Sequence, residues 1–265
     1  MKFNGYILVY NDYYYISEVI KSLEGVFDSL FIIEGAFQSS IDAGFAARSN
    51  EETMDRIYSF KNRGDIRIIH ANNLNEKTQR QFALNLCRQD KCDYFMMVDA
   101  DEVYKSQTLH KIKRALFESK GSIFGLKIQS YNFLNSFTKY YNGLYPRVYK
   151  MTPGAFVPYA NNVDWPDFNK GDSNYHIIGP EDRFYHYNYA KPDIESFKIR
   201  EAWLRKEGNG QEITQHGYGF NGIKYTIPIP ENEIFKFQGK HPKVMEENIF
   251  FKNNIYADNN IQYES

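Results

Sequence analysis

Apolar and polar residues alternate over the first hundred positions as four strand-length apolar runs separated by three segments of helical periodicity. The predicted strands and helices are, in chain order, strand 5–12, helix 15–30, strand 29–35, helix 49–60, strand 65–71, helix 75–91 and strand 92–102. The helix at 49–60 begins at Ser49 and has Glu52 three positions later, which is the spacing of a capping box. Strands and helices in this order predict an α/β fold, with a parallel sheet covered by helices on both faces.

The pattern changes after the fourth strand. A helix is predicted at 110–119, and the longer apolar runs at 122–134 and 144–151 are typical of mixed or antiparallel strands. A stretch punctuated by Gly, Pro and Asn follows, and then a long helix at 191–208 with a proline near its start and a glycine at its end. No clear linker divides the chain, so we expect a single domain with a C-terminal extension.

The composition is that of an ordinary globular protein. Of 265 residues 42% are apolar, and 32 basic against 33 acidic residues leave a formal charge of −1. Such a balance has no electrostatic footprint for nucleic acid or anionic lipid, so we expect no stable nucleic-acid binding. No apolar run approaches the roughly 20 residues that span a bilayer, and the first residues lack the apolar core of a signal peptide. With Cys87 and Cys92 interpreted as free thiols, we expect a cytoplasmic protein without a transmembrane segment.

Polar residues follow three of the predicted strands directly. Asn11 and Asp12 end the first strand, Glu34 ends the second, and Asp99 and Asp101 end the fourth. In parallel sheets of this kind ligands bind beyond the carboxyl ends of the strands, where these side chains would meet on one rim. The sequence therefore predicts a ligand site at this rim.

The acids of the fourth strand suggest a metal. Asp99 and Asp101 are alternate residues of a strand end, so their carboxylates project to the same side. Two or three oxygen ligands with open positions suit Mg²⁺ or Mn²⁺ shared with substrate phosphates, and a capped strand end without metal is the simpler alternative. A calcium loop that starts at Asp99 would need Gly at its sixth position and Glu at its twelfth, where the chain has Tyr104 and His110. A calcium loop is therefore excluded.

With these motifs in order, the chain resembles the family 2-like glycosyltransferases, which use nucleotide sugars and have the A-type fold (GT-A). The segment 8–35 is similar to the family's opening, with Asp12 for the usual Glu and Glu34 for the usual Asp. Arg80 stands on the helix before Asp-x-Asp, where the family also has an Arg. The run Asp-Ala-Asp-Glu, the segment FYHYNYAKPDIESFKIREAWLRK and the segment FQGKHPKVM are similar to later family motifs, although Asn188 stands where Gly is usual.

The resemblance implies a metal-dependent glycosyltransferase with a Rossmann-like, mostly parallel central sheet, helices on both faces and a C-terminal helical and loop extension. Residues 1–105 would bind the donor, a nucleotide diphosphate sugar with UDP-sugars favoured. Residues 106–240 would bind the acceptor and supply the closing helix, and residues 241–265 would form a tail.

The resemblance also implies the residues of the metal and donor sites. The ion, Mn²⁺ or Mg²⁺, would be held by Asp99 and Asp101, with His186 as the third ligand; a buried structural histidine is the alternative for His186. The implied donor-binding residues are Asn11, Asp12, Glu34, Arg80 and Asp99. The acids at the ends of the first two strands would accept hydrogen bonds from the base or ribose, and the arginine would face the diphosphate.

An inverting displacement needs a general base that takes the proton of the acceptor hydroxyl. Asp164 and Asp182 are both eligible. Asp164 lies beside Trp165, on which a sugar could stack, and Asp182 lies four residues before His186. The choice between the two stays open.

Two further histidines belong to motifs of the C-terminal half. His216 lies in a Gly-rich stretch that could form a lid over the donor, and an ordinary surface loop is the simpler interpretation. His241 is expected to fix a C-terminal turn, although the family motif leaves a binding role open.

Two other functions fit the same acids. A phosphatase of the haloacid-dehalogenase type would use Asp99 as nucleophile and Asp101 as acid/base, and residues 99 to 103 match its motif. A non-catalytic nucleotide-sugar-binding protein would keep the fold and lack the base. For the transferase, a glycan, a lipid, a protein and a modified nucleobase are all eligible acceptors.

Overall fold

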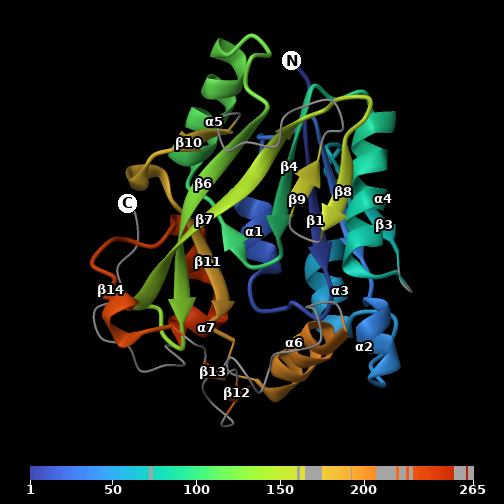
Figure 1. Ribbon diagram of the computed structural model, residues 1–265. Helices are drawn as coiled ribbons and strands as arrows, with labels where there is room; N and C mark the ends of the chain where they lie inside the picture. Colours follow the sequence, from blue (N-terminus) through green and yellow to red (C-terminus); the bar gives the residue numbers. More distant parts are fainter. Residues whose placement is uncertain are drawn as a thin grey trace.

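The computed structural model describes residues 1–71, 74–159, 162–164, 175–191, 193–206, 219–220, 225–226, 229–253 and 261. Of residues 158, 159, 162–164, 204–206, 219, 220, 225 and 226 it describes the backbone alone. The elements are arranged around one long twisted sheet whose strand order is β3-β2-β1-β4-β7-β6-β11-β5, with β10 and β14 paired to β6 and β7 (Figure 1).

The first half of the sheet is parallel. Its strands are β1 (Phe3–Val9), β2 (Ser29–Glu34), β3 (Ile66–His70) and β4 (Tyr94–Asp99). β1 is the central strand, pairing with β2 on one side and with β4 on the other. The carboxyl ends of these strands therefore lie on one edge, as the sequence predicted.

The second half continues the sheet with mostly antiparallel pairs. Its strands are β5 (Glu102–Val103), β6 (Gly125–Leu134), β7 (Lys139–Lys150), β10 (Tyr175–Ile178), β11 (Phe184–Tyr189) and β14 (Phe235–Lys236). β7 runs antiparallel to β4 and to β6, whereas β11 runs parallel to β6 and antiparallel to β5. The two predicted halves of the chain thus share one continuous sheet.

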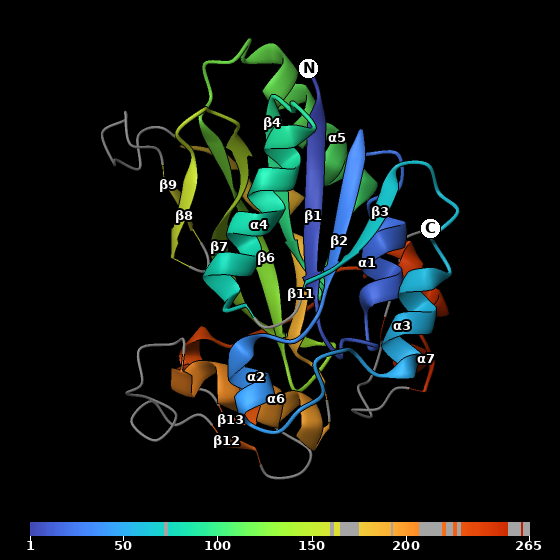
Figure 2. The same ribbon diagram turned by 90° about the vertical axis from the view of Figure 1, so that its right-hand side faces the viewer.

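Helices cover both faces of the parallel half (Figure 2). The helices are α1 (Ile16–Ser22), α2 (Gln38–Asp42), α3 (Glu51–Tyr58), α4 (Glu76–Gln89), α5 (Ser106–Glu118), α6 (Ile194–Lys206) and α7 (Ile249–Lys252). Ile7 and Val98 pack with α1 in one apolar core, whereas Tyr6 and Met97 pack with α4 in the other. Neighbouring residues of each strand point to opposite faces, so both faces are buried. The predicted α/β fold is confirmed.

The remaining described elements are short. They are the strands β8 (Phe156–Tyr159), β9 (Asn162–Asp164), β12 (Gly219–Phe220) and β13 (Tyr225–Thr226), and the 3₁₀ turns η2 (Pro180–Asp182), η3 (Glu231–Glu233) and η4 (Lys243–Glu247). η4 and α7 belong to the predicted tail, and they pack into the core through Met245 and Phe251. Among the described residues, no helix has both the length and the apolar character that a membrane crossing requires.

The start of α3 differs from the sequence prediction. The N-cap is Asn50, whose side chain accepts a hydrogen bond from the backbone N–H of Thr53. Ser49, the predicted cap, instead accepts a hydrogen bond from the backbone N–H of Asn11, and its own N–H donates to Glu34. The capping prediction is therefore wrong by one residue, because Ser49 ties the loop before α3 to the ends of β1 and β2.

Candidate active site

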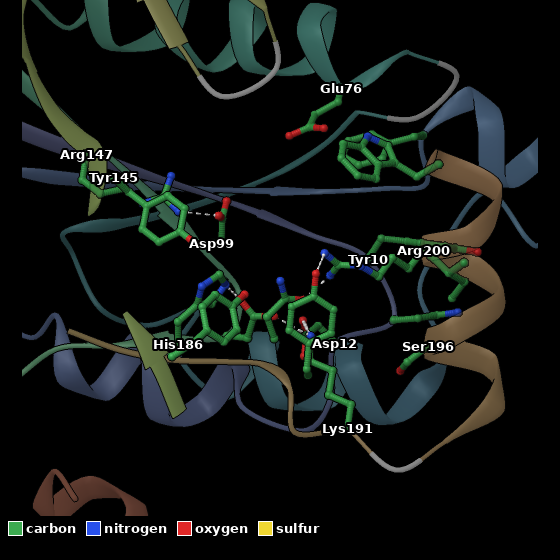
Figure 3. Close-up of a pocket in the computed structure, with 18 of the residues that line it drawn as sticks. Tyr10, Asp12, Glu76, Asp99, Tyr145, Arg147, His186, Lys191, Ser196 and Arg200 are labelled. Atoms are coloured by element: carbon green, nitrogen blue, oxygen red, sulfur yellow. Dashed lines mark hydrogen bonds and ion pairs between the residues drawn. The ribbon is translucent and has the colours of Figure 1, made fainter. Parts of the chain in front are cut away.

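A cavity of about 410 Å³ opens at the carboxyl ends of β1 and β4 (Figure 3). Its wall combines the β1–α1 loop, the end of β4, the strands β7 and β11, and one side of α6. The residues that line it include Tyr10, Asn11, Asp12, Glu76, Asp99, Asp101, Tyr141, Tyr145, Arg147, His186, Asn188, Tyr189, Lys191, Arg200 and Trp203. In both overall views α6 lies beside α2 below the strand ends (Figures 1 and 2). Its side of the cavity is lined by Ser196, Ile199, Arg200 and Trp203.

Two buried arginines oppose Asp99. Arg80 Nη2 donates to one carboxylate oxygen at 2.9 Å and Arg147 Nη2 to the other at 2.7 Å. Arg147 also pairs with the buried Glu102, whose second oxygen accepts a hydrogen bond from Tyr104 at 2.9 Å. Burial raises the pKa of Asp99, but the guanidinium groups of Arg147 and Arg80 outweigh it and hold the pKa well below its usual value. Asp99 is therefore an ionised carboxylate in a fixed orientation.

A lysine and a histidine oppose Asp101. Lys191 Nζ donates to Asp101 Oδ2 at 2.7 Å and to Asp12 Oδ2 at 2.6 Å, while His186 Nε2 lies 3.2 Å from Asp101 Oδ1. Burial raises the pKa of Asp101, but Lys191 and His186 outweigh it and lower the pKa below its usual value. At Asp12 burial outweighs Lys191 and raises the pKa to about 6. Asp101 is thus the better paired of the two acids.

The imidazole of His186 is oriented by Asn132 on the neighbouring strand β6. Asn132 lies opposite His186 in the sheet register, and its Oδ1 lies 2.8 Å from His186 Nδ1. Asn132 Nδ2 donates to the carbonyl of Tyr141, and Oδ1 also accepts from the hydroxyl of Tyr145, so Oδ1 acts as an acceptor. Nδ1 of His186 must then carry the proton. Its Nε2 faces Asp101, to which it would donate a hydrogen bond while it carries a proton, and it would offer a lone pair to a metal ion only after losing that proton.

These residues fit a divalent cation. Two neighbouring ligands of an octahedral Mg²⁺ or Mn²⁺ ion, each about 2.1 Å from the ion, lie about 3 Å apart. The 3.2 Å between His186 Nε2 and Asp101 Oδ1 matches this spacing. Asp99 and Glu102 also place carboxylate oxygens within 4.8 Å of a ring nitrogen of His186. Oxygen and imidazole donors are those that such ions accept.

The charge of the cluster points in the same direction. Its carboxylates are Asp12, Glu76, Asp99, Asp101 and Glu102, and its cations are Arg80, Arg147, Lys191 and Arg200. Among the described side chains of this cluster the carboxylates outnumber the lysine and arginine cations by one. A bound divalent cation would change this formal balance from −1 to +1.

Of the predicted donor-binding residues, Asn11 and Asp12 line the cavity, whereas Glu34 and Arg80 do not. Glu34 is fully buried, and its oxygens are bonded to the backbone N–H of Ser49 at 2.7 Å and to His70 Nδ1 at 2.7 Å. Arg80 is 3% exposed and acts on the site through its hydrogen bond to Asp99. In the described chain these two side chains therefore hold neighbouring residues in place.

The two predicted general bases have different positions. Asp182 is not among the residues that line the cavity; it forms an ion pair with Lys111 of α5 at 2.7 Å. Asp164 ends β9, where its backbone is paired with Phe156 of β8, and its side chain lies outside the described part of the chain. Trp165 also lies outside it.

Of the two histidines in C-terminal motifs, only His241 belongs to the described residues. His216 lies outside the described residues. His241 is 1% exposed; its Nδ1 lies 2.9 Å from the hydroxyl of Tyr187, and its Nε2 lies 2.8 Å from the carbonyl of Phe137. These contacts fix the segment before η4 against β11, in keeping with the structural interpretation of His241.

The sequence reasoning missed four residues that organise the site: Arg147, Lys191, Asn132 and Arg200. Arg147 and Asn132 lie in segments predicted as strands and Arg200 in a segment predicted as a helix, so no local signal distinguished them. The predicted helix begins at Lys191, whereas α6 begins at Ile194. Arg200 on α6 bonds to Asn188 and donates to Tyr189 at 2.7 Å. Only Asn188 gave a sequence clue to Arg200, because it stands where the family usually has Gly. In the structure its side chain accepts a hydrogen bond from Arg200.

No protein-family model matches the chain, and no curated protein matches it in sequence. Among solved structures, it is similar to S. aureus TarS, with 15% identity over 80% of this chain and a TM-score of 0.46. The chain spans 40% of that TarS structure, and 67% of a TarS 1–349 structure in complex with UDP-GlcNAc, where the identity is 13% over 78% of this chain and the TM-score 0.47.

A second similar structure is glucosyl-3-phosphoglycerate synthase from Mycobacterium tuberculosis in complex with Mn²⁺ and UDP-glucose. The identity is 14% over 50% of this chain and 44% of that chain, with a TM-score of 0.36. A third is 4-diphosphocytidyl-2C-methyl-D-erythritol synthase from Anaerococcus prevotii, with 10% identity over 56% of this chain and 70% of that chain and a TM-score of 0.37. These similarities concern the path of the chain alone, and they assign no family and no substrate to this protein.

Proposed function

We propose that this protein is a divalent-metal-dependent glycosyltransferase that moves a sugar from a nucleotide diphosphate sugar to an acceptor hydroxyl. The observation that carries the proposal is the meeting of Asp99, Asp101 and His186 at the cavity, with His186 Nε2 at 3.2 Å from Asp101. His186 comes from a distant part of the chain, and because its Nδ1 is engaged with Asn132, Nε2 is the nitrogen that a metal would bind.

The residues divide the work as follows. Asp101 and His186 would hold the ion, with Asp99 beside them, and a bound ion would stabilise the negative charge that develops on the leaving diphosphate. Arg147 and Arg80 keep Asp99 ionised and oriented. Ligands whose charge and direction are set in advance need no rearrangement during the reaction, which lowers the barrier.

The donor would lie across the rim between the β1–α1 loop and α6. Asn11, Asp12 and Tyr10 line this side of the cavity, and Arg200 projects into it from α6 (Figure 3). A uridine diphosphate carries two to three negative charges, so the bound ion and Arg200 would both be needed to balance it. UDP-GlcNAc and UDP-glucose, held by the similar TarS and glucosyl-3-phosphoglycerate synthase structures, are the first donors to test.

The acceptor would enter on the opposite side, along Tyr141 and Tyr145 of β7. For the general base of an inverting displacement Asp164 is the candidate to test first, because Asp182 forms an ion pair with Lys111 and does not line the cavity, whereas the side chain of Asp164 lies outside the described residues. The comparison of Asp164→Asn with Asp182→Asn tests this choice. Asp164→Asn should abolish transfer and leave donor binding intact, and loss of transfer in Asp182→Asn alone would reverse the assignment.

The phosphatase alternative is disfavoured by the surroundings of Asp99. A nucleophilic aspartate needs one free oxygen facing the phosphoryl group. Both oxygens of Asp99 accept hydrogen bonds from arginines, at 2.9 Å and 2.7 Å. This geometry suits a fixed ligand or counterion.

The decisive experiment is ligand-dependent thermal unfolding combined with donor hydrolysis. Mn²⁺ and UDP together should raise the melting temperature more than the sum of their separate effects, and a UDP-sugar should be hydrolysed slowly in the presence of Mn²⁺. Asp101→Asn and His186→Gln should lose both effects, whereas Asp182→Asn should keep the binding effect. If millimolar Mn²⁺ with UDP-, GDP- and dTDP-sugars neither stabilises the protein nor yields free sugar, the proposal is wrong.

A further inference from the structure

Lys191 joins the acid cluster to the helix that closes the cavity. It follows β11 directly and precedes α6, which begins at Ile194. Its ammonium group donates to Asp12 at 2.6 Å and to Asp101 at 2.7 Å, and the side chain is only 11% exposed. A single buried cation thus joins the residues that follow β1 and β4, at a position three residues before α6 begins.

A second hydrogen bond ties α6 to the same rim. Asn11 Nδ2 donates to Glu195 Oε1 at 3.0 Å. The cavity face of α6 carries Arg200 and Trp203. Polar contacts near the start of α6 and the bonds of Arg200 to Asn188 and Tyr189 together place these two side chains, and Lys191 makes the most buried of these contacts.

We propose that Lys191 is a positioning residue that couples occupation of the metal site to the closure of α6. The inference rests on the proposed function, because it takes Asp101 and His186 as the ligands of the ion. Asp101 divides its two oxygens between these partners: Oδ2 accepts from Lys191, and Oδ1 faces His186. The carboxylate of Asp101 would therefore serve both as a ligand of the ion and as the hydrogen-bond acceptor of Lys191, the residue that leads into α6.

The coupling follows from this shared carboxylate. An ion bound between Oδ1 and His186 would restrict Asp101 to one rotamer, which is also the rotamer that presents Oδ2 to Lys191. The ion would then favour the closed position of α6, and a closed α6 would favour the ion by the same factor, because coupling between two sites is reciprocal. The donor would meet Arg200 and Trp203 only after the ion is in place.

The test is hydrogen exchange of residues 196–206 with and without Mn²⁺, in wild type, Lys191→Met, Lys191→Arg and the control Lys198→Met. Lys198 is an exposed lysine on the same helix. In wild type Mn²⁺ should slow exchange in α6 by about fivefold or more. Lys191→Met should exchange about tenfold faster in α6 without the ion, with little change in β1 and β4, and should lose the Mn²⁺ effect on α6. Lys191→Arg should keep part of the Mn²⁺ effect on exchange in α6, and Lys198→Met should behave as wild type.

A second readout uses Trp203, one of only two tryptophans. In a Trp165→Phe background, the emission of Trp203 should shift on addition of Mn²⁺ and should not shift when Lys191→Met is added. Electron paramagnetic resonance of Mn²⁺ reports binding separately. The coupling is wrong if Mn²⁺ binds Lys191→Met and still slows hydrogen exchange in α6. It is also wrong if bound Mn²⁺ leaves hydrogen exchange in wild-type α6 unchanged. If Mn²⁺ binds neither protein, the proposed function fails first, and unchanged α6 exchange in metal-free Lys191→Met would then overturn the attachment itself.

Discussion

Asn132 Oδ1 lies 2.8 Å from His186 Nδ1, although the two residues are 54 positions apart in the chain. The contact joins β6 and β11, which pair in register at these positions. It decides which nitrogen of the imidazole is protonated, and so which nitrogen is available to a metal. The candidate metal site thus depends on Asn132 as well as on its proposed ligands, because Asn132 orients the imidazole of His186.

The first prediction concerns this contact. Asn132→Leu should lower Mn²⁺ affinity about 10- to 100-fold, because outer residues that orient a metal-binding histidine contribute about that much. Asn132→Asp keeps an acceptor at this position and should keep most of the affinity. Isothermal titration with Mn²⁺ measures both, with the exposed Asn62→Leu as control. Equal affinities in Asn132→Leu and wild type would contradict the orienting role.

Gly143 of β7 packs beneath Asn132. A Cβ at this position would lie 2.5 Å from Asn132 Nδ2 and 2.5 Å from Ser130 Oγ, closer than any relaxed contact. We expect Gly143→Ala to displace Asn132, to weaken Mn²⁺ binding, and to destabilise the fold by about 1–3 kcal/mol. Gly179→Ala is the matched control, since nothing lies within 4 Å of its added Cβ. Urea denaturation and Mn²⁺ titration of the two variants should therefore differ; identical results would show that Asn132 tolerates the added methyl group.

Arg147 is the central cation of the buried acid cluster. It is 2% exposed and pairs with both Asp99 and Glu102. Arg147→Met leaves two carboxylates without this partner, and we expect the free energy of unfolding to fall by about 3–5 kcal/mol. Arg147→Lys should lose less, because it keeps the charge.

Chemical denaturation at pH 7 measures these losses. The exposed Arg114→Met, whose arginine pairs only with the exposed Glu118 in the described structure, should change stability by no more than about 0.5 kcal/mol. A loss of similar size in Arg114→Met and Arg147→Met would show that the buried pairs are not the cause.

His241 should make stability depend on pH. Burial lowers its pKa to about 3 in the folded protein, whereas an unfolded histidine has a pKa of about 6.5. As the pH falls below about 6.5, His241 therefore becomes protonated in the unfolded state but stays neutral in the folded state. The stabilisation from neutral His241 is complete above that pH, and it decreases by about 1.4 kcal/mol per pH unit toward pH 3.

Urea denaturation of wild type and His241→Gln between pH 7.5 and pH 4.5 tests this dependence. The glutamine variant should start less stable, because it cannot keep both contacts with Tyr187 and Phe137 in the same geometry. Its stability should then fall less steeply with pH than that of wild type, by the equivalent of one proton. Parallel pH profiles for the two proteins would assign the dependence to other groups.

The amino-acid sequence alone determined the α/β order of the first hundred residues and the gathering of the strand-end acids. Both follow from local rules: helical and strand periodicity can be recognised within a short window, and parallel strands place their carboxyl ends on one edge. For the same reason the cavity could be expected near Asn11, Asp12, Asp99 and Asp101, and these residues do line it. His186 could be proposed only through a resemblance to known enzymes.

The tertiary structure alone decided what compensates the acids. Arg147 reaches Asp99 because β7 pairs antiparallel with β4, with Val148 opposite Met96, and Asn132 reaches His186 because β11 pairs with β6. A shift of one residue in either pairing would turn these side chains to the opposite face of the sheet. Register depends on the packing of the whole sheet, so no local pattern could have identified Arg147, Asn132 or Lys191 as partners of the site.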